Sequence, residues 1–387
     1  MSLCTVCDLD QQWLRRTNPP APVPNGTTLR IVDLFAGCGG LAFGLVEAAR
    51  RLGVRAEVAL AVERDKSALD IFESNLPTLD ARCSDVELVF DGELGAALTL
   101  AERRIGREVR DVDLLVGGPP CQGNSDLNNK TRRDDPRNRL YARMARAAEV
   151  LEPACVVIEN VPSVRHDRSG VVAVTRSALD SMGFRCMEAV VDARRAGVPQ
   201  RRRRHVLVAV RDADVDLSFL EQFSQRCPHV RSISWAILDL ETRASDTPFD
   251  SGAGVSQDNR RRIAWLFDNK KYDLPNSERP ECHHSKHSYG SMYGRLRWGD
   301  PAQTLTTGFG SMGQGRYVHP SRRRTLTPHE AARIQTFPDY FDFGVTPRTS
   351  LARMIGNAVP PLLNVVLGES LIAQLSDVET EQEDSAA

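Results

Sequence analysis

The sequence lacks a cysteine framework, a strong excess of either charge, and an apolar run that suggests a membrane span. Its nine cysteines are an odd number without regular spacing, which excludes a disulfide-stapled scaffold and favours a reducing compartment. The N-terminus contains acidic residues and a Trp where a signal peptide would need a continuous apolar stretch. We therefore expect a cytoplasmic protein with no membrane partner.

The charge balance excludes a chain that is basic throughout. Fifty basic and 51 acidic residues leave a formal net charge of −1. This total does not exclude nucleic acid as a partner, because a local basic stripe is sufficient to bind it.

The sequence does contain a regular alternation of short apolar runs and helix-like segments. The 387 residues, 41% hydrophobic and 26% charged, suit two globular domains. The alternation predicts a doubly wound α/β sheet of the Rossmann-like type. The expected strands cover 29–35, 57–63, 112–118, 154–161 and 204–210, and the expected helices cover 40–52, 66–75, 140–151, 171–182, 327–335 and 361–375.

Changes in composition predict the domain boundaries. Residues 1–28 end in a Pro-rich stretch and are expected to be a flexible extension. The α/β domain covers 29–211, and a smaller, irregular, Arg-rich domain covers 212–324. Residues 325–375 are expected to return to the first domain, and 376–387 to form a disordered acidic tail.

The first expected strand ends in a glycine-rich turn that suits a cofactor. Gly37, Gly39 and Gly40 would let a ligand approach backbone N–H groups at a helix N-terminus. Glu63 ends the next strand at about the spacing that places an acidic side chain on ribose hydroxyls. Asp85 follows a third strand and could accept a hydrogen bond from adenine. The full dinucleotide fingerprint is missing, so an adenosine cofactor without a pyrophosphate fits better than NAD.

A thiol and a carboxyl group are expected at the same sheet edge. Cys121 follows a buried strand, and the prolines before it restrict the loop and aim the thiol. Glu159 and Asn160 end the next strand, where Glu159 can serve as a proton donor. A buried structural cysteine is the ordinary alternative for Cys121.

Four consecutive arginines precede the last expected strand of the α/β domain. In one continuous strand, Arg202 and Arg204 share one side, and Arg201 and Arg203 share the other. Beside a thiol and a carboxyl group, they favour a phosphate-bearing substrate over a solvated charge cluster. Further arginines of the second domain would form the other wall of a basic cleft: Arg261, Arg262, Arg295, Arg297 and Arg322 to Arg324.

A metal site is not expected. Cys4 and Cys7, Cys227 with His229, and Cys282 with His283 and His284 could in principle gather around zinc, but they lack a second close pair at finger-like spacing.

These blocks, in this order, resemble the DNA cytosine-5 methyltransferase family, from Leu29 to Leu375. DLFAGCGG is similar to its methyl-donor motif, GGPPCQGNS to its Pro-Cys nucleophile motif, ENV to its Glu-Asn-Val motif, and QRRRR to its Gln-x-Arg-x-Arg motif. RTLTPHEAARIQTFPD and IGNAVPP are similar to its last two motifs. His329 stands where the family commonly has Arg.

The resemblance assigns a role to each matching residue. Cys121 is the nucleophile and Glu159 the acid, Arg204 would hold the cytosine carbonyl or its phosphate, and Arg202 would support Arg204. S-adenosylmethionine would contact Phe35, Pro119 and Asn357, besides the glycine turn, Glu63 and Asp85. The resemblance implies that residues 212–324 are the target-recognition domain. The residues expected to contact the substrate are Gln122, Ser125, Asn160 and Gln200.

The resemblance implies methyl transfer to C5 of a flipped-out cytosine in duplex DNA, through a covalent bond from Cys121 to C6. By the same resemblance, we expect a nucleoid-associated monomer that acts on DNA. A cognate endonuclease or defence components would accompany it, as is common in the family. Two alternatives remain: a tRNA cytosine-5 methyltransferase, whose Cys-Phe-Thr motif is missing here, and a non-catalytic DNA-binding relative.

Overall fold

The computed structural model describes residues 4–24, 26, 28–120, 136–211, 215–222, 229–243, 247–284 and 291–386. These residues divide into two compact units, each considered by itself. Unit 1 comprises Met1–Pro19, Ala193–Arg202 and Cys227–Ala358, and unit 2 comprises Pro20–Asp192, Arg203–Arg226 and Val359–Ala387. The division differs from the expected boundaries, since residues 325–358 belong to unit 1 and only Val359 onward belongs to unit 2.

Unit 2 is built on a seven-stranded sheet, which confirms the expected α/β class. The strand order is β3-β2-β1-β4-β5-β8-β6. β1, β2, β3, β4 and β5 are parallel, and β8 runs antiparallel to both of its neighbours. The strands are β1 (Thr28–Leu34), β2 (Arg55–Glu63), β3 (Ala81–Cys83), β4 (Leu114–Gly117), β5 (Cys155–Asn160), β6 (Arg185–Asp192) and β8 (Arg203–Val210).

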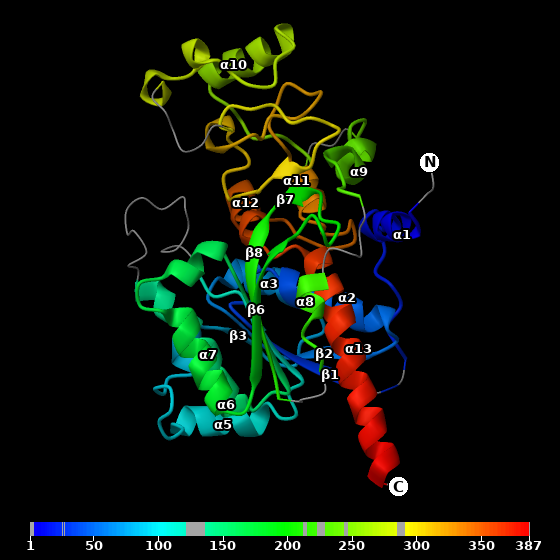
Figure 1. Ribbon diagram of the computed structural model, residues 1–387. Helices are drawn as coiled ribbons and strands as arrows, with labels where there is room; N and C mark the ends of the chain where they lie inside the picture. The colour runs from blue at the N-terminus through cyan, green and yellow to red at the C-terminus, as the bar shows by residue number, and fades with distance from the viewer. Residues whose placement is uncertain are drawn as a thin grey trace. The chain divides into compact units, whose positions relative to one another are not determined.

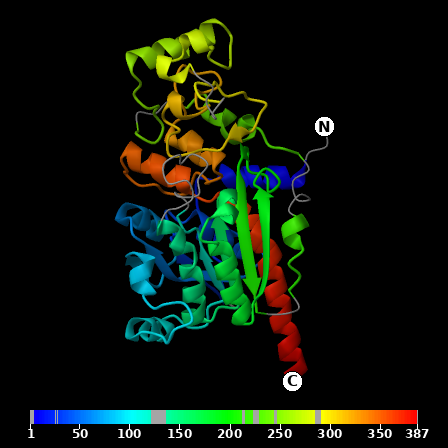
Figure 2. The same cartoon turned by 60° about the vertical axis from the view of Figure 1, so that its left-hand side comes forward.

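Helices cover both faces of this sheet. In Figure 1, α5, α6 and α7 lie on one side, and α2 and α13 lie on the other. Figure 2 shows the same two layers from a second direction. Strands buried on both faces are mostly apolar, as β4 and the first four residues of β5 are. The helices are α2 (Gly40–Arg51), α3 (Lys66–Asn75), α4 (Val86–Val89), α5 (Leu100–Glu108), α6 (Arg143–Leu151), α7 (Val171–Ser181), α8 (Phe219–Gln222) and α13 (Pro361–Ala386), with 3-10 turns η1 (Pro136–Tyr141) and η2 (Pro162–His166).

The C-terminal helix α13 belongs to the core. It packs along α2, and Asn364 Nδ2 donates to the carbonyl of Gly40 at 3.3 Å. Residues 348–375 are long and apolar enough to cross a membrane, contrary to the expectation from the sequence, but 67% of their most apolar window is buried inside the protein. The helix continues to Ala386, through the tail expected to be disordered. Its Glu and Gln residues are good helix formers that extend an existing helix.

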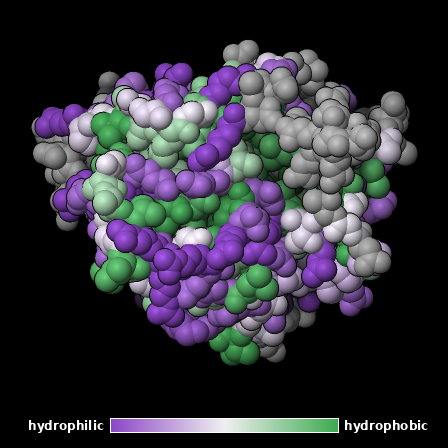
Figure 3. Space-filling view, turned by 90° about the horizontal axis from the view of Figure 1, so that it is seen from below, coloured by the Kyte–Doolittle hydropathy of each residue, from purple (hydrophilic) through white to green (hydrophobic). Residues whose placement is uncertain are grey.

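The amino ends of the strands form the edge of the sheet opposite to the predicted site. A hollow of about 840 Å³ opens there, on the side seen in Figure 3. It is lined by both signs of charge and by apolar residues: Gly106, Arg107, Val109, Arg110, Asp111, Val112, Asp113, Val150, Leu151, Glu152, Ala154 and Arg211. None of these is a predicted site residue, so this hollow is not the predicted active site.

Unit 1 has little regular structure and one short two-stranded sheet. β7 (Gln200–Arg201) pairs in parallel with β9 (Ala302–Gln303). The helices are α1 (Thr5–Leu14), α9 (Ile233–Ile237), α10 (Gln257–Asp268), α11 (Pro328–Ile334) and α12 (Arg348–Asn357), with 3-10 turns η3 (Leu238–Leu240), η4 (Asn276–Glu278), η5 (Glu281–His283) and η6 (Met312–Gln314).

The N-terminus is a helix, where the sequence led us to expect a flexible extension. Trp13 and Leu14 of α1 are buried, and Asp10 forms a buried ion pair with Arg231 at 2.8 Å. The Arg231 guanidinium also lies over the Trp235 ring, 4.3 Å from its centroid. These contacts with a distant part of the chain stabilise a helix that its Pro-rich neighbourhood would not predict.

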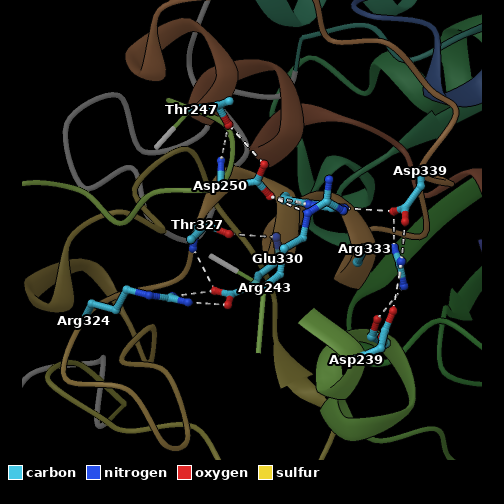
Figure 4. Close-up of polar contacts among 11 residues, drawn as sticks. Asp239, Arg243, Thr247, Asp250, Arg324, Thr327, Glu330, Arg333 and Asp339 are labelled. Atoms are coloured by element: carbon cyan, nitrogen blue, oxygen red, sulfur yellow. Dashed lines mark hydrogen bonds and ion pairs between the residues drawn. The ribbon is translucent and has the colours of Figure 1, made fainter. Parts of the chain in front are cut away.

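A polar network fixes α11 within unit 1 (Figure 4). Thr327 and Glu330 form a capping box at its start, and Arg324 donates to both oxygens of Glu330 at 2.7 and 2.6 Å. At its other end, Arg333 pairs with Asp339 and, at 3.2 Å, with Asp239. Burial favours a raised pKa for Asp339, but contacts from Arg333 and His329 outweigh it and hold that pKa well below its usual range. His329 therefore occupies a structural position between Asp250 and Asp339, 2.7 and 2.9 Å from its ring nitrogens.

Candidate active site

The predicted cofactor turn follows β1 at the carboxyl edge of the sheet, where the strand order reverses on either side of β1. Ligands bind at such switch points in open α/β sheets. Phe35, Gly37 and Gly39 all have positive φ, at 58°, 55° and 95°. A Cβ on Gly39 would lie 3.0 Å from the Phe72 ring, so both its conformation and its surroundings require glycine. A non-glycine residue such as Phe35 in this region carries backbone strain, which is common at binding sites.

Glu63 fixes this turn from the end of β2. One carboxylate oxygen accepts the N–H of Gly37 at 2.9 Å, and the other accepts the N–H of Asp65 at 2.8 Å. Asp85 caps α4 without a side-chain hydrogen bond to it, and its side chain is 57% exposed. The structure thus brings the glycine turn and Glu63 together and leaves the Asp85 carboxylate accessible.

The end of β4 is tied to the end of β5. Asn160 Nδ2 donates to the Pro119 carbonyl at 3.1 Å, and its Oδ1 accepts the N–H of Val161 at 2.8 Å. Both Asn160 and Pro119 are buried. Cys121, Gln122 and Ser125 lie outside the described residues, so Asn160 holds the last described segment before the predicted nucleophile.

Glu159 and Arg204 form an ion pair at the same edge. Arg204 Nε lies 2.7 Å from Glu159 Oε1, and the two side chains are only 12% and 11% exposed. They come from the neighbouring antiparallel strands β8 and β5. A carboxyl group and a guanidinium are therefore already paired where a planar heterocycle would need both.

Arg202 lies at a break between β7 and β8, so the four arginines do not form one continuous strand. That Arg202 and Arg204 share one face stays a prediction. Arg202 is buried in unit 1, where it donates to the carbonyls of Leu305 at 3.3 Å and Ala358 at 2.9 Å. Arg201 and Arg203 are exposed.

Gln200 is also a buried residue of unit 1. Its Oε1 accepts the N–H of Leu305 at 2.8 Å, and its Nε2 donates to Gln335 Oε1 at 2.9 Å. Gln335 in turn donates to the Ile355 carbonyl at 2.6 Å, close to Asn357, whose own side chain is exposed. These contacts hold backbone segments of unit 1 around Gln200 and Arg202.

The sequence reasoning missed Gln335 and Asn364. Both are buried amides that hold segments next to predicted site residues. For Asn364 the available signal was a lone amide in an otherwise apolar stretch, because a buried amide needs hydrogen-bond partners. Within the described part of the chain, no three His, Cys, Asp or Glu side chains gather as metal ligands would. Cys227 lies outside it.

Comparison with known proteins identifies the family. Residues 29–373 match the family of C-5 cytosine-specific DNA methylases. The chain belongs to this family.

Its relatives include bacterial enzymes of similar length. The chain is 45% identical over 359 residues to the type II methyltransferase M1.BsuMI of Bacillus subtilis, covering 92% of this chain and 84% of that one. It is 31% identical over 354 residues to the type II methylase M.HgiDII of Herpetosiphon aurantiacus, covering 88% and 94%. DNA (cytosine-5) methylation is therefore the activity of the chain.

A solved structure supports the fold. The S. pombe Dnmt2 methyltransferase aligns with a TM-score of 0.63 at 17% identity, covering 90% of this chain and 99% of that one. At this identity the likeness concerns the fold alone, and it agrees with the α/β methyltransferase sheet of unit 2.

Proposed function

We propose that the protein transfers a methyl group from S-adenosylmethionine to C5 of a flipped-out cytosine in duplex DNA, with Cys121 as the covalent nucleophile. The observation that carries this proposal is the junction of β4 and β5. There the Asn160–Pro119 hydrogen bond restrains the chain two residues before Cys121, and the Glu159–Arg204 pair joins β5 to β8.

The donor set at the β1 turn fits an adenosine cofactor. Positive φ at Gly37 and Gly39 shapes the turn ahead of α2, Glu63 supports the turn, and Asp85 offers an exposed carboxylate. Phe35 and Pro119 supply the apolar surface beside it. When bound, S-adenosylmethionine supplies an electrophilic methyl group.

The residues of this chain make cytosine reactive. The Cys121 thiolate attacks C6, and Glu159 donates a hydrogen bond or proton to N3, so that electron density moves to C5. Arg204 binds the cytosine carbonyl or its phosphate. After C5 takes the methyl group, the C5 proton passes to water and Cys121 leaves C6 as the thiolate, which restores the ring. Such a pocket cannot admit a stacked base, so the nucleotide must leave the duplex.

The remaining predicted roles concern the DNA and its cellular setting. Ser125 would meet the DNA backbone, and Gln122 and Gln200 would support the target nucleotide. Of the recognition region expected at 212–324, unit 1 contains the part from Cys227 onward. The type II relatives support a role in restriction–modification. A role in phage defence and a cognate endonuclease are further parts of the proposal. We propose a cytoplasmic, nucleoid-associated monomer.

The test is methyl transfer from labelled S-adenosylmethionine to duplex DNA and, in parallel, to tRNA. Bisulfite sequencing of the DNA then identifies the modified base and its context. Cytosine C5 modification of duplex DNA alone supports the proposal. Modification of tRNA alone, or of neither substrate, contradicts it.

A further inference from the structure

The arginines of unit 1 are not equivalent. Ten lie between Arg260 and Arg324. Seven of these donate hydrogen bonds or form ion pairs inside the unit: Arg262, Arg279, Arg295, Arg316, Arg322, Arg323 and Arg324. A guanidinium whose donors are used in this way supports the fold and is poorly placed to read a ligand.

Three arginines keep their donors free. In the described part of the chain, the exposed Arg260, Arg261 and Arg297 have no side-chain hydrogen bond or ion pair. Arg260 and Arg261 project from the first half of α10, with no aromatic ring beneath them. Arg297 differs, because its guanidinium carbon lies 4.6 Å from the centroid of the Tyr272 ring. Stacking restrains a long side chain that would otherwise lose much rotamer freedom on binding.

Tyr272 is itself fixed in place. Its carbonyl accepts the N–H of Arg295 at 2.8 Å and Nη1 of Arg316 at 2.9 Å. Its side chain is 37% exposed, so the ring supports Arg297 without burying it.

The backbone around Arg297 explains why two arginines lie over this ring. Leu296 is 2% exposed and its N–H donates to the Val318 carbonyl at 2.8 Å. Because side chains alternate along an extended segment, Arg295 and Arg297 share the other side. Arg295 lies 5.1 Å from the Tyr272 centroid, but its Nε donates to the Pro320 carbonyl at 2.7 Å. Arg297 is therefore the member of the pair whose planar N–H edge faces solvent.

A stacked guanidinium whose N–H groups are unpaired can donate two hydrogen bonds to a pair of acceptors that lie in one plane. In duplex DNA, the O6 and N7 atoms of guanine in the major groove form such a pair. We propose that Arg297, held on the Tyr272 ring, is a specificity-determining residue that reads one guanine of the DNA target. The inference rests on duplex DNA being the substrate, as proposed above.

A phosphate oxygen pair could also bind this guanidinium, and the two contacts differ in their consequences. Loss of a phosphate contact lowers binding about equally for all sequences, and Lys can replace Arg there. Loss of a bidentate guanine contact lowers binding only where that guanine is present, and Lys cannot replace Arg. Arg261 is the matched control, since it is exposed and unpaired but has no ring beneath it.

The experiment measures methylation by the full-length protein on a library of randomised duplexes, read by bisulfite sequencing. For the wild type we expect one position at which guanine is required. Arg297→Ala and Arg297→Lys should each reduce the preference for guanine there by about 10- to 100-fold and leave the other positions unchanged. Tyr272→Leu should weaken the same preference, and Arg261→Ala should lower the total yield without changing any preference.

Two results would overturn the inference. One is an unchanged preference in Arg297→Ala. The other is a uniform loss of yield in Arg297→Ala that Arg297→Lys restores, which identifies a phosphate contact. Absence of methylation by the wild type on every duplex would instead count against the proposed function, so the two failures are distinguishable.

Discussion

Arg204 and Glu159 meet at the end of neighbouring antiparallel strands, with 2.7 Å between Nε and Oε1. Both side chains are nearly buried, so the pair is formed by the fold before any base arrives. Because each group has a role on cytosine in our proposal, the pair defines where the base must lie.

Glu159→Gln should therefore lower kcat by about 10²- to 10⁴-fold, because the amide cannot supply a proton to N3. Binding of S-adenosylmethionine should change little. Single-turnover methylation and calorimetric titration measure the two effects. Glu188 is a carboxylate on β6 that contacts His205. Glu188→Gln is the control and should keep near-normal activity. A Glu159→Gln protein with wild-type turnover would remove Glu159 from the mechanism.

Asn160→Ala should slow the chemical step by roughly tenfold, because it removes one buried hydrogen bond that holds the Pro119 carbonyl. The KM for S-adenosylmethionine should stay close to its normal value, as expected for a positioning residue. Asn75→Ala, which loses a comparable bond to the Ile71 carbonyl within α3, is the matched control. If Asn160→Ala changes only the KM, the proposed support of the Cys121 segment is incorrect.

Glu63→Gln should weaken S-adenosylmethionine binding by roughly 10- to 100-fold, because hydrogen bonds to a charged carboxylate are lost from the Gly37 and Asp65 N–H groups. Titration calorimetry with the cofactor measures this directly. Glu57, near the start of the same strand, pairs with Arg30. Glu57→Gln is the control and should leave the affinity for S-adenosylmethionine unchanged. Equal affinities for Glu63→Gln and the wild type would contradict the assignment of this turn.

His319 should make unit 1 less stable in acid. Burial lowers the pKa of His319 to about 4, from an ordinary value of 6.5, and its Nδ1 accepts the N–H groups of Ser321 and Arg322 at 3.2 and 3.0 Å. Between these two pH values the unfolded chain binds a proton that the folded chain excludes. The free energy of unfolding should therefore fall as the pH drops from 6.5 towards 4, by about 1.4 kcal/mol per unit at most.

Tryptophan fluorescence can follow this unfolding, because all four tryptophans belong to unit 1: Trp13, Trp235, Trp265 and Trp298. His319→Asn keeps an acceptor for the two N–H groups and cannot titrate, so its stability should depend less on pH across this interval. The same slope in the variant and the wild type would assign the effect to other groups.

The sequence was sufficient to predict the sheet and to place Glu63, Glu159 and Asn160 at the carboxyl ends of its strands, because these features follow from local patterns. Apolar strands, a glycine turn and an acidic residue one strand later placed Glu63 correctly near the turn. The failures arise from long-range contacts. Nothing local shows that Arg202 interrupts a strand and binds the Leu305 and Ala358 carbonyls, or that α1 is stabilised through Asp10 and Arg231.

The central claim, covalent attack by Cys121 on cytosine, is tested most directly by trapping the adduct. Duplex DNA with 5-fluorocytosine at the target base has no C5 proton to lose, so methylation should leave the protein bonded to the DNA. We predict a denaturant-resistant complex with wild type and none with Cys121→Ser, although both proteins bind S-adenosylmethionine. A stable complex with Cys121→Ser, or none with wild type that methylates the unmodified duplex, would contradict the mechanism.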